Sequence, residues 1–144
     1  MKGFGDLYKS QKKKSKKSKF SNEKIINQAI QLHLKGNISE AEKYYQQLIN
    51  QGCKNHTVFS NYGVILIGQG KLKDAEKCFR ESIKINPDYA MSHSNLGGIL
   101  RDIGKLKEAE ISTRKAIELN PNCVEAYTTL GNILRDMGNL QQAE

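Results

Sequence analysis

Three asparagines at a fixed spacing form the pattern in this sequence that most directly suggests a chemical role. Asn27, Asn61 and Asn95 lie 34 residues apart, and Thr129 holds the next equivalent position. An amide side chain has hydrogen-bond donors and an acceptor, so it can pair with a peptide backbone whatever the peptide sequence. The spacing therefore favours recognition of main-chain groups, provided that the fold places these side chains on one surface.

The sequence offers no convergent set of catalytic or metal-binding residues. None of His33, His56 and His93 has a partner at i+3 or i+4 that suggests a metal site. Neither a G-x-x-x-x-G-K-[ST] phosphate loop nor a G-x-S-x-G nucleophile motif occurs. We expect no cofactor, no metal and no enzymatic activity from this chain alone, and leave open the activity of a longer parent protein.

A 34-residue period that starts at Asn22 predicts the structural elements that must position the asparagines. The segment LGGILRDIGKLKEAE, Leu96–Glu110, returns 34 residues later as LGNILRDMGNLQQAE, with ten of fifteen positions identical. A period of this length is typical of helical repeats that stack into a solenoid. It divides the chain into blocks at 22–55, 56–89, 90–123 and an incomplete 124–144.

Each block reads as two helices. Phe59, Tyr62 and Leu66 occupy i, i+3 and i+7, which is one helical face. Glycine inside a helix costs up to ~1 kcal/mol, so the recurring eighth-position glycines suggest close helix packing: Gly63, Gly97 and Gly131. Other glycines suit left-handed helix ends: Gly36, Gly70, Gly104 and Gly138. With Pro87 and Pro121 ending second helices, we expect helices near 22–35, 38–51, 56–69, 72–85, 90–103, 106–119 and 124–137.

The second block carries the residues Phe59, Tyr62, Gly63, Leu66, Ala75, Phe79 and Pro87. Their spacing resembles the tetratricopeptide (TPR) pattern W-x₂-L-G-x₂-Y…A-x₃-F…P. The resemblance implies an all-α TPR solenoid, a right-handed superhelix of antiparallel helix pairs with about three and a half repeats. The departures are modest: no block has the Trp, Gln28 and Cys53 replace the Leu and Pro of block one, and Thr113 replaces an aromatic residue.

The TPR resemblance also implies a concave groove lined by positions 2, 5, 6, 9, 12 and 13 of each repeat, and hence a protein- or peptide-binding scaffold. The candidate groove residues are Asn27, Asn61, Asn95, Thr129, Asn132, Arg101, Asp102, Arg135 and Asp136. The Arg-Asp pairs form either a second polar row or solvated surface pairs worth under ~1 kcal/mol each. The cationic clamp of chaperone-binding TPR domains is absent, because position 5 holds Ile26, Ser60, Ser94 and Thr128 and no Arg occupies position 6.

A second interpretation is that the chain is the N-terminal, substrate-presenting region of a larger transferase. The segment AMSHSNLGGIL, Ala90–Leu100, resembles repeats of protein O-GlcNAc transferases, and similar arrays precede glycosyltransferase or sulfotransferase domains. The severed fourth repeat suggests a fragment of a longer array. It should expose some of Leu130, Ile133, Leu134 and Met137, and so favour fraying or self-association at this end.

Most of the positive charge lies in one short segment. Residues 1–20 carry +7 of the net charge of +8, and dense like charge with few apolar residues predicts a disordered tail. Weak contact with nucleic acid or an anionic membrane would use Lys12, Lys13, Lys14, Lys16, Lys17 and Lys19. We favour a solvated leader that aids solubility, because lysine is abundant throughout, with 19 Lys against 4 Arg.

The cysteines and the N-terminus indicate the compartment. Cys53, Cys78 and Cys123 are odd in number and form no C-x-x-C pair, which argues against disulfides and a cysteine metal site. We expect buried or half-buried thiols in a reducing compartment. The sequence has no secretory signal and no run of ~20 apolar residues, so we expect a cytoplasmic protein.

Overall fold

The computed structural model describes Lys9, Lys12 and residues 22–143, and within these residues all regular structure is helical. Most of the Lys-rich tail, including Lys13, Lys14, Lys16, Lys17 and Lys19, lies outside the described residues, so its disorder and its contacts stay predictions. The chain forms two compact units, Met1–Cys53 and Lys54–Glu144. None of the described helices is long and apolar enough to cross a membrane.

The described residues of the first unit include a helix pair, formed by residues 22–34 and α2 (Ile38–Asn50). Gly36 adopts φ +79° between them, which confirms the predicted left-handed turn. The Gln28 amide donates to the Tyr44 hydroxyl over 3.1 Å, and the rings of His33 and Tyr45 meet edge to face at 6.0 Å. Tyr45 is fully buried, so the aromatic position of this repeat packs into its core.

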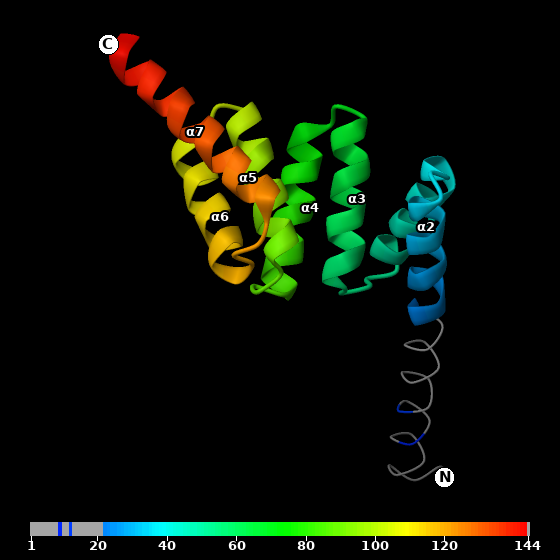
Figure 1. Cartoon of the computed structure of the whole chain (residues 1–144). Coiled ribbons are helices and arrows are strands. Elements are labelled where there is room, and N and C mark those ends of the chain that lie inside the picture. Colours follow the sequence, from blue (N-terminus) through cyan, green and yellow to red (C-terminus); the bar gives the residue numbers. More distant parts are fainter. Residues whose placement is uncertain (1–8, 10–11, 13–21, 144) are drawn as a thin grey trace. The chain divides into compact units, whose positions relative to one another are not determined.

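The second unit contains five helices within the described residues: α3 (His56–Gly68), α4 (Leu72–Ile85), α5 (Ala90–Asp102), α6 (Leu106–Leu119) and α7 (Val124–Ala143). Figure 1 shows them stacked in chain order. Each helix packs against the next, and α5 also contacts both α3 and α7. This arrangement confirms the predicted all-α TPR helical-repeat solenoid, in which successive first helices are neighbours.

Left-handed glycines follow α3 and α5 in this unit, and Asn-Pro pairs follow α4 and α6. Gly70 and Gly104 have φ of +72° and +82°, and the next amides close the helices by donating to Leu66 and Leu100 carbonyls at 2.9 and 2.7 Å. Before Pro87 and Pro121, α4 and α6 end as predicted. There the Asn86 and Asn120 side chains each accept a hydrogen bond from the backbone amide two residues on, at 3.2 Å.

The predicted end of the last helix is wrong. α7 continues through Gly138 to Ala143, and Gly138 does not adopt a positive φ. At Gly70 and Gly104 the reversed chain enters a helix of 14 residues that packs back on its neighbour. Among the described residues, no helix follows Gly138 to pack back on α7, and the residues up to Ala143 keep their backbone hydrogen bonds within the one helix.

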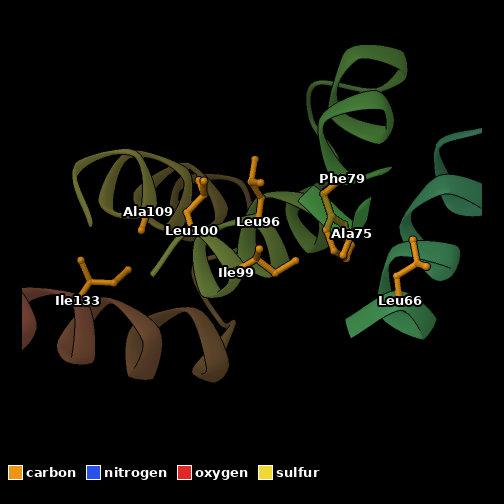
Figure 2. Packing of buried hydrophobic residues seen from close by; sticks show 8 residues of the cluster. All are labelled: Leu66, Ala75, Phe79, Leu96, Ile99, Leu100, Ala109 and Ile133. Atoms are coloured by element: carbon orange, nitrogen blue, oxygen red, sulfur yellow. The ribbon is translucent and has the colours of Figure 1, made fainter. Parts of the chain in front are cut away.

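The core of the second unit lies between its helices (Figure 2). It contains Leu66, Ala75, Phe79, Leu96, Ile99, Leu100, Ala109 and Ile133. A Cβ atom on Gly63 would lie 2.8 Å from Phe79 Cζ, and one on Gly97 would overlap the Thr113 hydroxyl. These contacts at Gly63 and Gly97 confirm the predicted close approach of the two helices in each of these repeats. At Gly131 the prediction is wrong, because no described atom lies within 4 Å of such a Cβ, since no second helix packs there.

The predicted exposure of α7 is confirmed in part. Leu134 is 45% exposed, whereas Leu130 and Met137 are half-buried. Ile133 was among the residues expected to lose cover, but it is fully buried and belongs to the core. The reason is that Ile133 faces the neighbouring repeat, which α5 and α6 supply. Self-association through this end stays a prediction.

Candidate functional site

The sixth-position residues occupy equivalent places on consecutive helices of the second unit. Asn61 lies on α3, Asn95 on α5 and Thr129 on α7, and all three are half-buried. Because α3 contacts α5 and α5 contacts α7, these residues follow one side of the helix stack. We call the side that carries positions 2, 5, 6, 9, 12 and 13 of these helices the groove face. Asn27 is exposed and belongs to the first unit.

An ion pair joins two of the predicted site residues across the repeats. Arg101 Nε on α5 donates to Asp136 Oδ2 on α7 over 2.7 Å, and both side chains are about 30% exposed. The hydrogen bond that Arg101 donates to Asp136 raises the pKa of Arg101. Asp102 is exposed, and its carboxylate lies 3.9 Å from the Arg101 guanidinium. The closer pair thus links positions 12 and 13 of different repeats, and it shows that α5 and α7 turn the same side toward each other.

The remaining two predicted residues contact each other on α7. Arg135 Nη2 donates to Asn132 Oδ1 over 3.0 Å. Arg135 is exposed and Asn132 is half-buried, so the guanidinium extends into solvent from the groove face. The α7 part of this face is therefore polar, with amide, hydroxyl and guanidinium groups in one stretch.

Sequence reasoning missed the apolar character of the same face on α3. Val64 and Ile67 occupy positions 9 and 12 and are 37% and 36% exposed. The equivalent residues on α5 are Gly98 and Arg101. Reading positions 9 and 12 of the second block would have found this signal. The groove face thus changes from apolar on α3 to polar on α7, which suits a ligand with an unevenly polar surface.

The histidines and cysteines serve packing in the described structure. The His56 ring meets Tyr89 edge to face at 4.6 Å, and His93 Nε2 lies 2.8 Å from the Pro87 carbonyl oxygen. The three cysteines are free and half-buried as expected. Burial raises the pKa of Cys78 to about 11, which disfavours the reactive thiolate. Among the described residues, no three His, Cys, Asp or Glu side chains gather in a way that could hold a metal ion.

Solved TPR domains have the same fold. The first TPR of Spaghetti (RPAP3) bound to the HSP90 peptide SRMEEVD has a TM-score of 0.75 and 21% identity, covering 81% of this chain and 93% of that one. The Sgt2 TPR domain from Aspergillus fumigatus also scores 0.75, with 20% identity, 86% of this chain and 84% of the other covered. The second TPR domain of human RPAP3, in complex with the HSP70 peptide SGPTIEEVD, scores 0.67 at 22% identity, covering 74% and 89%.

Sequence comparison finds fewer similar proteins than structure comparison does. No curated protein matches the chain. One family model, the middle TPR-like domain of cilia and flagella-associated protein 70, matches residues 27–144. The match spans all four sequence blocks, including the incomplete last one. The chain therefore belongs to the family of this middle TPR-like domain.

Proposed function

We propose that the chain is a binding scaffold that holds a protein segment in extended conformation along the groove face. The observation that carries the proposal is the placement of Asn61, Asn95 and Thr129 at equivalent positions on α3, α5 and α7, where α5 contacts both of the other helices. Their side chains offer donors and acceptors at a regular interval, as a peptide backbone does. The repeat boundaries at 56, 90 and 124 belong to the same proposal, because they set these equivalent positions.

The Arg101–Asp136 pair supports the proposal by fixing the two helices that carry Asn95 and Thr129. The pair is short and spans α5 and α7, so it helps to hold these two helices in one arrangement before a ligand arrives. A preorganised surface loses less conformational freedom on binding. The apolar Val64 and Ile67 would contact a ligand side chain at the α3 end of the face.

The ligands of the solved relatives differ from the ligand proposed here. The Spaghetti and human RPAP3 domains were solved with peptides that end in EEVD. In this chain position 5 of the second unit holds Ser60, Ser94 and Thr128, none of which can neutralise a C-terminal carboxylate. We therefore propose an internal segment as the ligand. No observation favours the transferase alternative.

A peptide-library selection tests the proposal. Binders selected from random dodecapeptides on the intact chain would be resynthesised with acetylated and amidated ends. We expect Asn61→Ala with Asn95→Ala to weaken their binding at least ~5-fold, since each net hydrogen bond contributes ~0.5–1.5 kcal/mol and ~1.4 kcal/mol is tenfold. The control changes Asn50 and Asn139, which are exposed and outside the groove face, to Ala. Equal affinities for the wild type and the groove variant would refute the proposal.

A further inference from the structure

A second concave surface lies between the second helices of two repeats. α4, α5 and α6 line an open hollow of about 340 Å³. Its apolar lining comes from Ile83, Leu96 and Ile111, one from each helix. None of its lining residues occupies a groove-face position, so the hollow is separate from the site proposed above.

Ile111 departs from the pattern of the repeats. It is 70% exposed, and the equivalent residues in the first two blocks are Lys43 and Lys77. An apolar side chain at a position that other repeats leave to lysine adds nothing to the core. Beside a hollow floored by Leu96 and walled by Ile83, it instead extends an apolar surface that a ligand side chain can cover.

The rim of the hollow is cationic. Arg80, Lys84 and Lys115 line it, and no carboxylate does. Lys115 also departs from the repeat, because Glu81 holds the equivalent position in the second block. Lys84 and Lys115 each pair with a glutamate three residues away on their own helix, at 3.7 and 2.8 Å. Exposed pairs of this kind are weak, so both lysines can exchange these partners for a ligand carboxylate.

We propose that this hollow docks a peptide segment in which one large apolar side chain is flanked by aspartate or glutamate. The apolar side chain enters between Ile83, Leu96 and Ile111. The flanking carboxylates pair with Lys84 and Lys115 at the rim. Arg80 is held by Glu76 and Glu108 at 2.8 and 2.7 Å, so it shapes the wall and is not expected to change partners.

The test uses the intact chain and a synthetic peptide, acetyl-Ser-Asp-Asp-Leu-Asp-Asp-Ser-amide, followed by ¹⁵N–¹H correlation spectra. We expect shifts at the amides of Ile111, Ser112 and Lys115. Ile111→Gln should weaken binding about tenfold, because most of an exposed Ile side chain loses its apolar contact. Lys115→Glu, which restores the residue type of the second block, should weaken it further by repulsion. Peptides with Ser for Leu, or Lys for Asp, should not bind.

Matched controls keep the result decisive. Leu140→Gln removes another exposed apolar side chain, and Lys54→Glu reverses another exposed charge; neither residue lines the hollow. Both should bind as the wild type does. The proposal is overturned if the peptide leaves the hollow's amides unshifted, if its shifts fall only on the groove face, or if Ile111→Gln and Lys115→Glu keep wild-type affinity. Both variants alter exposed or half-exposed helix positions, so each is expected to fold.

Discussion

The eighth-position glycines allow a test of the helix packing in which the chain supplies its own control. At Gly63 an added Cβ would lie 2.8 Å from Phe79 Cζ and 2.9 Å from Cε2. Phe79 is fully buried, so its ring cannot move away without disturbing α3, α4 and α5. At Gly131, the equivalent residue of the fourth block, a Cβ would meet no described atom within 4 Å. The same substitution therefore meets a filled site in one repeat and an open site in another.

The two effects have opposite signs. Replacing Gly by Ala inside a helix gains up to ~1 kcal/mol of helix propensity, and Gly131→Ala should show this stabilisation in full. Overpacking a dense core costs ~1–3 kcal/mol, so Gly63→Ala should lose up to about 2 kcal/mol after the full helix-propensity gain is subtracted. For a chain of this size each kcal/mol shifts the melting temperature by ~2–4 °C.

Urea unfolding followed by circular dichroism at 222 nm measures both variants. Gly98→Ala is a second control, since its Cβ also meets nothing within 4 Å. The expected order of stability places Gly131→Ala and Gly98→Ala above the wild type and Gly63→Ala below it. If Gly63→Ala is as stable as Gly131→Ala, Phe79 does not fill the space beside Gly63, and the packing described here is wrong.

Three further predictions concern charge and reactivity. Burial opposes ionisation of Glu76, but hydrogen bonds from Arg80 and Lys105 outweigh this effect and lower the pKa of Glu76 below 4.5. The stability that ionised Glu76 contributes is present above pH 4.5 and should be lost as the pH falls through this lowered pKa. Acid titrations of Glu76→Gln should lack this loss. Cys78, with a pKa of about 11, should react with iodoacetamide at pH 8 far more slowly in folded than in urea-unfolded protein, as peptide mass spectrometry can check. Any binding to nucleic acid should fall steeply with salt and disappear when residues 1–20 are removed; filter binding that survives the deletion would exclude the tail as its cause.

The period made most of the fold predictable from the sequence. Gly70 and Pro87 mark helix ends by backbone preferences that act locally, and six of the seven expected helices end within one or two residues of their predicted ends. The end of α7 could not be predicted in the same way. Gly138 has nearly the same sequence context as Gly104, but a left-handed turn there gains stability only when the helix that follows packs back.

The repeat pattern predicted only part of the candidate site. The repeat pattern located Asn61 and Asn95 but could not pair Arg101 with a partner, because Asp102 and Asp136 are equally plausible from sequence. Which carboxylate is closer depends on the offset between α5 and α7, a property of packing. The exposed Val64 does not recur, because Gly98 and Asn132 hold the equivalent positions on α5 and α7, so the repeat pattern does not indicate it.

Departures from the repeat carry more functional information than its recurrences. Residues that recur every 34 positions are retained by duplication as well as by selection, so the asparagine row alone has two explanations. Duplication of a repeat does not explain exposed residues that break the pattern. Two exposed residues of this kind are also little constrained by the core: Ile111, where the first two blocks have lysine, and Ile67, where α5 and α7 have arginine. These two positions lie on different surfaces, which is why we assign the chain two separate contacts with its partners instead of one.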